Sequence, residues 1–123
     1  MATLVHFDIS ADDPGRAQRF YQQLLGWTFT SLPAPMDYTM IATTDVSGAP
    51  GVGGGLAKRT GQAPGIVNFF GVASVDQSLK QVEQLGGKVV QPTQPVPGFG
   101  YMAVCQDTES NVFGLFQDDP TAR

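Results

Sequence analysis

The chain has 123 residues and a net charge of −4, and 41 % of its residues are hydrophobic, which is the profile of one globular domain rather than a disordered chain. No apolar run approaches the roughly 20 residues needed to cross a bilayer, and no basic N-terminal region precedes an apolar core, so we expect a cytoplasmic protein without a membrane partner. Its seven Lys and Arg are scattered, which disfavours a nucleic-acid partner, and its single cysteine, Cys105, excludes an internal disulfide.

The first half of the chain is predicted to form a strand, a helix and three further strands. The strand LVHFDIS covers residues 4–10. Asp13 is a suitable N-cap, Pro14 fits the first helical position, and Gly26 is placed to end the helix. The helix carries apolar residues at helical spacing, so we expect one buried face, made of Ala17, Phe20, Tyr21 and Leu24. Three strand-like runs follow within residues 27–32, 37–44 and 51–58.

The second half repeats this pattern at an offset of 61 residues, obtained by placing Asp13 on Ser74. A strand within 65–74 precedes a helix that begins with the capping box Ser74–Gln77 and ends at Gly86-Gly87. Strands are then predicted at 88–92, 100–106 and 111–117, and Gly54 is matched with Gly114. We therefore expect an α+β fold in one domain, residues 1–123. It would contain two β-α-β-β-β modules, about 1–60 and 65–118, joined near 60–65, because each half-sheet alone would leave a face unburied.

The doubled unit resembles the vicinal oxygen chelate superfamily, which includes glyoxalase I, bleomycin-resistance proteins and extradiol dioxygenases. Members often carry a His on the first strand and an Asp seven residues on, as His6 and Asp13 do here, followed by Phe20-Tyr21 and Gly26-Trp27. The segment Asp107–Asn111 before VFGLF corresponds to the Asp-Pro-Asp-Gly-Asn of many members. The resemblance implies curled four-stranded mixed sheets that form a cup, with a helix on each convex face. It also implies a homodimer and a glyoxalase-like member of unassigned role.

Active members of that superfamily place a divalent metal in the cup, and the resemblance identifies His6 as the first ligand position. The other two ligand positions fall on Val67 and Gly114, whose side chains offer no donor atom. Asp8 lies on the same face as His6, but two donors do not reach the usual three protein ligands of a catalytic divalent site. We therefore predict no metal cofactor, and we expect His6 to line a pocket and hydrogen-bond a neighbour or a ligand.

Strand alternation predicts which residues line this pocket. Val5, Phe7 and Ile9 should pack under the helices, so that His6 and Asp8 face the concavity; Phe113 and Leu115 should enter the core if Gly114 lies on the ligand face. The strand register is uncertain by one residue, and Trp27 fits a pocket rim or a core position equally well. The full predicted lining is His6, Asp8, Trp27, Tyr38, Met40, Val67, Phe69, Tyr101, Met102, Val112, Gly114 and Phe116.

Two functions from different classes fit this lining. The first is a binding protein that holds a small apolar or aromatic ligand without turning it over, with no catalytic residue. The alternative is a metal-dependent lyase, isomerase or dioxygenase with atypical ligands. A third possibility is an accessory protein that uses the edges of the cup to meet another chain, which a cup filled by its own side chains would favour. Cys105 has no visible activating partner, so we expect a buried small residue there rather than a nucleophile.

Overall fold

The computed structural model describes residues 1–61 and 65–123, which form two helices and eight strands in two units. The N-terminal unit is His6–Val67, and the C-terminal unit combines Met1–Val5 with Asn68–Arg123. The predicted join between the modules, near 60–65, falls partly outside the described residues. No helix among the described residues is long and apolar enough to cross a membrane.

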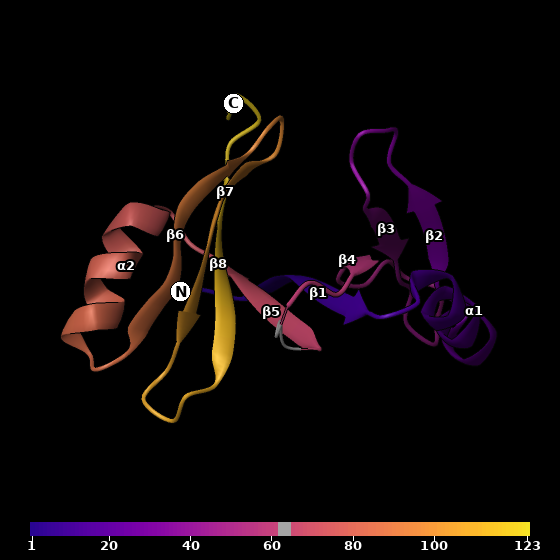
Figure 1. Ribbon diagram of the computed structural model, residues 1–123, viewed down its shortest axis with the longest axis horizontal. Coiled ribbons are helices and arrows are strands. Elements are labelled where there is room, and N and C mark those ends of the chain that lie inside the picture. Colours follow the sequence, from indigo (N-terminus) through magenta and orange to yellow (C-terminus); the bar gives the residue numbers. More distant parts are fainter. Residues whose placement is uncertain (62–64) are drawn as a thin grey trace. The chain divides into compact units, whose positions relative to one another are not determined.

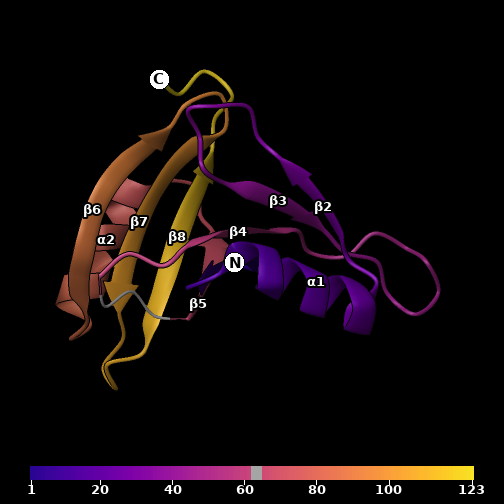
Figure 2. The same cartoon turned by 45° about the vertical axis from the view of Figure 1, so that its right-hand side comes forward.

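The N-terminal unit contains β1 (Leu4–Ala11), α1 (Pro14–Leu25), β2 (Thr28–Ser31), β3 (Thr39–Ala42) and β4 (Gly54–Lys58), although the first residues of β1 lie in the other unit. The strand order is β2-β3-β4-β1. The β1–β4 pair is parallel, whereas the β2–β3 and β3–β4 pairs are antiparallel. Figure 2 shows α1 beside these strands, and its side chains cover a core of Ile9, Ala11, Ile41 and Leu56.

Helix α1 begins and ends where the sequence predicts. The Asp13 side chain accepts a hydrogen bond from the Arg16 N–H at 3.0 Å, and Gly26 ends the helix in the left-handed region at φ 70°. The predicted buried face is only half correct, because Phe20 and Leu24 are 59 % and 65 % exposed. Ala17 and Tyr21 face the core. Phe20 lies about 80° round the helix axis from the mean direction of Ala17 and Tyr21, and Leu24 lies about 40° from it in the last turn of the helix.

The C-terminal unit contains β5 (Ile66–Gly71), α2 (Val75–Gln84), β6 (Lys88–Val96), β7 (Gly100–Gln106) and β8 (Val112–Asp118), in the strand order β5-β8-β7-β6. The β5–β8 pair is parallel and the other pairs are antiparallel. Figure 1 shows α2 against one face of the sheet, where Val75, Ala103, Cys105 and Leu115 form the core. As predicted, the Ser74 hydroxyl accepts from the Gln77 N–H, at 3.2 Å. Residues before His6 join this unit, since the Gly71 N–H donates to the Thr3 carbonyl at 2.9 Å.

The β-α-β-β-β unit is therefore used twice in an α+β fold, as the sequence predicts, but the register corrects one match between the halves. Asp8 pairs with Gly55, and Phe69, which lies 61 residues after Asp8, pairs with Gly114. The counterpart of Gly114 is therefore Gly55, and the predicted match to Gly54 is wrong by one residue. The correction matters because a shift of one residue moves a side chain to the other face of the sheet.

Candidate functional site

Three polar side chains of the N-terminal unit converge on one point of its sheet. The His6 Nε2 atom lies 2.9 Å from Asp8 Oδ1 and 2.8 Å from the Tyr38 hydroxyl, and that hydroxyl donates to Asp8 Oδ1 at 2.5 Å. His6 and Asp8 are neighbours on one face of β1, whereas Tyr38 comes from the segment just before β3. Their side chains are only partly buried, at 28 % exposed for His6 and 34 % for Asp8. The cluster is thus open to solvent on one side.

The hydrogen-bond pattern assigns the proton of the imidazole. The Tyr38 hydroxyl gives its single proton to Asp8, so toward His6 it can only accept. An unprotonated Nε2 would then face two acceptors at hydrogen-bond distance, which would be repulsive. Nε2 therefore carries a hydrogen and donates to this pair. In this arrangement Nε2 acts as a hydrogen-bond donor and not as a metal ligand.

Burial raises the pKa of the Tyr38 hydroxyl far above its ordinary value of 10.0, and the negative charge of Asp8 and their shared hydrogen bond raise it further. Ionisation would place a second negative charge beside Asp8 in a poorly hydrated position. Tyr38 therefore remains a hydrogen-bond donor throughout the neutral range and does not act as a base.

Gly55 makes this contact possible. It lies on β4 between Met40 of β3 and Asp8 of β1, so it is the middle residue of a row across three strands. Tyr38 extends its side chain over Gly55 to reach Asp8, and a Cβ at residue 55 would overlap the phenol hydroxyl. The glycine-rich run GVGGGLAK thus supplies the space that the Tyr38 ring occupies.

The C-terminal unit has an apolar counterpart to this row. Gly114 lies between Phe69 of β5 and Val104 of β7, and the Phe69 ring lies over it, 4 % exposed. Strand alternation and pairing place five of the predicted lining residues on one face, opposite Ala103 and Leu115: Phe69, Met102, Val112, Gly114 and Phe116. Phe113 and Leu115 pack into the core beside α2, as expected.

The remaining predicted lining residues lie elsewhere. Trp27 is packed in the core, with its ring 5.0 Å from the Tyr21 ring and 5.4 Å from the Phe7 ring, so the structure decides for the core position. Tyr101 packs on the α2 side of its sheet, away from Met102. Val67 is half-buried in the N-terminal unit. Val5, expected under the helices, is 41 % exposed.

The sequence is similar to one family model and to two curated proteins. A family model described as "Bleomycin resistance protein-like N-terminal" matches residues 3–44. The proteins named "Putative glyoxylase CFP32" from Mycobacterium tuberculosis (strain CDC 1551 / Oshkosh) and Mycobacterium bovis are each 26 % identical to this chain over 124 residues. Those matches cover 96 % of this chain but 45 % of each relative, so the chain spans less than half the length of the curated relatives it matches.

Solved structures share the fold over nearly the whole chain. A methylmalonyl-CoA epimerase in complex with methylmalonyl-CoA and ammonium aligns with a TM-score of 0.68 and 17 % identity, covering 99 % of this chain and 98 % of that one. A variant of the Streptomyces coelicolor enzyme, with 2-nitronate-propionyl-CoA, gives 0.67 and 17 %, covering 98 % and 97 %. A Legionella pneumophila protein described as an NAD-dependent benzaldehyde dehydrogenase gives 0.62 and 22 %, covering 93 % and 98 %. The chain shares the fold of these proteins, and its sequence is similar to the bleomycin-resistance-like family model and to the two relatives named as glyoxylases.

The metal that the resemblance to the vicinal oxygen chelate superfamily implies does not fit the donor atoms of this chain. Among residues 1–61 and 65–123, no three His, Cys, Asp or Glu side chains lie close enough to share an ion. His6 and Asp8 are the two donors at the first ligand position, and their hydrogen bonds go to one another and to Tyr38. At the strand-eight position the Phe69 ring covers Gly114. A ring over a glycine offers no ligand to a divalent cation.

Proposed function

We propose that this protein binds a small apolar or aromatic molecule and holds it without a protein-bound metal, as a member of the superfamily that sequesters rather than transforms its ligand. The observation that carries the proposal is the closed network of His6, Asp8 and Tyr38. In it the His6 Nε2 atom is engaged by Asp8 and Tyr38.

The polar network and its neighbours in the N-terminal unit support a ligand with an apolar body and one polar group. Asp8 presents a partly exposed carboxylate that already accepts from Tyr38 and His6, so a ligand would meet one fixed polar group there. Met40 lies in the same row of residues as Gly55 and Asp8 and adds an apolar side chain within the N-terminal unit. Small-molecule sites commonly combine apolar walls with a few placed polar groups.

The alternative, a metal-dependent lyase, isomerase or dioxygenase, requires donors that these positions do not supply. This alternative predicts that the purified protein contains near one equivalent of a catalytic ion held through His6. It also predicts that His6→Ala loses that ion. We expect substoichiometric Zn, Ni, Mn and Fe in protein prepared without chelator, and the same metal content in His6→Ala. One equivalent of metal that disappears in the variant would refute the proposal.

Ligand binding is tested by a thermal-shift screen with aromatic and other apolar compounds. A binder at 100 times its dissociation constant adds about 2.7 kcal/mol to the free energy of unfolding. Its affinity should fall in Asp8→Asn and Tyr38→Phe. The control is Asp37→Asn, which removes an exposed carboxylate next to Tyr38 in sequence that forms no side-chain hydrogen bond or ion pair with the described residues. Equal affinity in all three variants would show that the ligand does not bind at the network of His6, Asp8 and Tyr38.

We further propose that the working form is a cytoplasmic homodimer, since half-sheets with open edges are commonly completed by a second chain. Sedimentation at micromolar concentration should show twice the mass of the chain. A monomer under those conditions would contradict this part of the proposal and leave the ligand test unaffected.

A further inference from the structure

A hollow lies in the N-terminal unit, on the helix side of β1. It is an open depression of about 410 Å³ between the end of β1, the first turns of α1 and Arg59. Ile9 and Ala11 form part of its wall, and these residues point away from the face that carries His6 and Asp8. The hollow is therefore separate from the proposed ligand site, and its volume falls within the range of small-molecule sites.

Apolar and aromatic side chains form one side of the hollow. Helix α1 contributes Ala17, Phe20 and Tyr21 to this side. Phe20 is 59 % exposed, which is unusual for a large aromatic residue on a helix that also has a polar face. The Phe20 and Tyr21 rings meet edge to face, with centroids 5.3 Å apart. An exposed aromatic ring at the edge of a cavity is suited to contact with the flat or branched body of a ligand.

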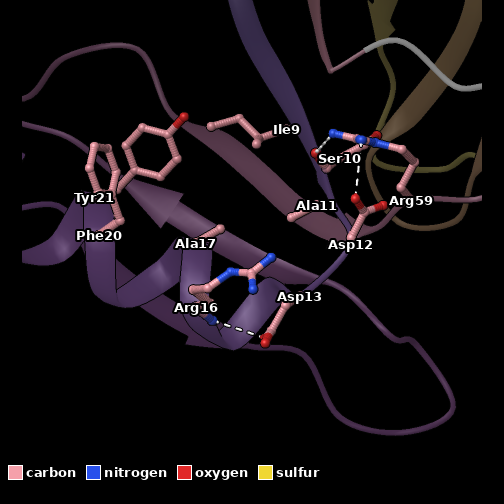
Figure 3. Close-up of a pocket in the computed structure, with 10 residues that line it drawn as sticks. All are labelled: Ile9, Ser10, Ala11, Asp12, Asp13, Arg16, Ala17, Phe20, Tyr21 and Arg59. Atoms are coloured by element: carbon pink, nitrogen blue, oxygen red, sulfur yellow. Dashed lines mark hydrogen bonds and ion pairs between the residues drawn. The ribbon is translucent and has the colours of Figure 1, made fainter.

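Charged side chains form the other side of the hollow, and one of them, Arg16, makes no side-chain bond to another described residue. Arg59 donates to the Ser10 carbonyl at 3.1 Å and lies 3.5 Å from Asp12, so its guanidinium is held in place. The Asp13 carboxylate is bound to the backbone N–H of Arg16. The Arg16 guanidinium itself has no hydrogen-bond or ion-pair partner among the described residues. Figure 3 shows it between Ala17 and Asp13, with the two rings on one side and Arg59 on the other.

We propose that this hollow binds a small organic carboxylate with an aromatic or branched apolar body. The Arg16 fork, with five N–H donors, would engage the carboxylate, while Phe20, Tyr21 and Ala17 would contact the apolar body. Arg59 adds a second positive charge at the rim and is partly balanced by Asp12. The charge on Arg16 makes the site selective for an acid over the corresponding amide.

The chain carries its own reporter for this site. Trp27 is its single tryptophan, and its ring stacks on that of Tyr21 at 5.0 Å. A ligand that contacts Tyr21 should therefore change the Trp27 emission. The probes are phenylacetate and phenylacetamide, which have similar shapes and differ in the charge that Arg16 would recognise.

Phenylacetate should produce a saturable change in Trp27 emission at millimolar concentration and should bind about tenfold more tightly than phenylacetamide. Arg16→Gln should remove this preference. Arg19→Gln is the matched control, because Arg19 carries the same charge on the same helix but does not line the hollow. Phe20→Ser should weaken both probes, whereas His6→Ala should change neither, which separates this site from the proposed ligand site.

Three results would overturn the proposal. The first is the absence of a saturable response to phenylacetate in the native protein. The second is an equal loss of preference in Arg16→Gln and Arg19→Gln when both variants keep the native circular dichroism spectrum, since that would show a general charge effect. The third is Trp27 emission that changes with protein concentration but not with phenylacetate, which would assign the hollow to a second copy of the chain.

Discussion

Replacing Gly55 with alanine should displace the Tyr38 side chain and lower the free energy of unfolding by about 2 kcal/mol. The new Cβ would overlap the phenol hydroxyl, which is the far end of a side chain that can swing away, so the backbone need not move. The displaced hydroxyl loses its bond to the Asp8 carboxylate, and a hydrogen bond to a charged group contributes about 1.5–3 kcal/mol. The contact with His6 adds about 1 kcal/mol. Alanine in a strand raises the free energy of unfolding by roughly 0.5–1 kcal/mol relative to glycine, which offsets part of this loss.

A double-mutant cycle tests this reasoning. In the background of Tyr38→Ala there is no ring to displace, so Gly55→Ala should be neutral or slightly stabilising, and the coupling energy should be about 2 kcal/mol. Urea unfolding followed by Trp27 fluorescence measures all four proteins. Gly65→Ala is the control, because nothing lies within 4 Å of a Cβ at residue 65. Additive effects in the cycle would show that the Tyr38 ring does not lie over Gly55 and would refute the network on which the proposed function rests.

Three further predictions follow from backbone geometry and burial. Ser110 has φ 65°, so Ser110→Gly should raise the free energy of unfolding by roughly 0.5–1 kcal/mol in urea titrations, whereas an unchanged or lower value would contradict strain in this turn. Because the pKa of Tyr38 is raised in the folded protein, its contribution to stability is present below about pH 10 and is lost as the pH rises above 10. Tyr38→Phe should therefore reduce the loss of stability at alkaline pH. The same variant should lack the most alkaline component of the tyrosinate absorbance titration. Burial raises the pKa of the fully buried Cys105 thiol, so its reaction with a disulfide reagent should proceed at the rate of unfolding, and rapid labelling of the native protein would count against that burial.

The strongest local signals predicted the elements well. Asp13, Pro14 and Gly26 bound α1 as expected, and Ser74 caps α2, because capping depends on a few neighbouring residues that the sequence displays directly. The repeat at an offset of 61 residues predicted the second module for the same reason. The match of Gly54 to Gly114 failed by one residue, since both halves have several glycines or apolar residues in succession and only the strand pairing sets the register.

Burial was harder to predict for helix faces than for strands. The spacing of Phe20 and Leu24 is that of a buried stripe, yet α1 contacts its sheet along a narrower line, and both side chains stay exposed. Periodicity identifies the apolar side of a helix but does not give the width of the surface that covers it. The same exposure of Phe20 helps to form the hollow beside α1, which no sequence motif predicted. The unusual feature that could have pointed to it is a basic residue, Arg16, in the first turn of a helix.

The amino-acid sequence by itself determined the doubled β-α-β-β-β architecture and the absence of donor side chains at Val67 and Gly114, because residue identity and spacing along the chain suffice for both. The tertiary structure alone decided that the Tyr38 hydroxyl reaches Asp8 and His6 across Gly55, and that Trp27 packs in the core. A contact between residues 30 positions apart depends on strand register and on the space that a missing side chain leaves, and neither quantity is written in the local sequence.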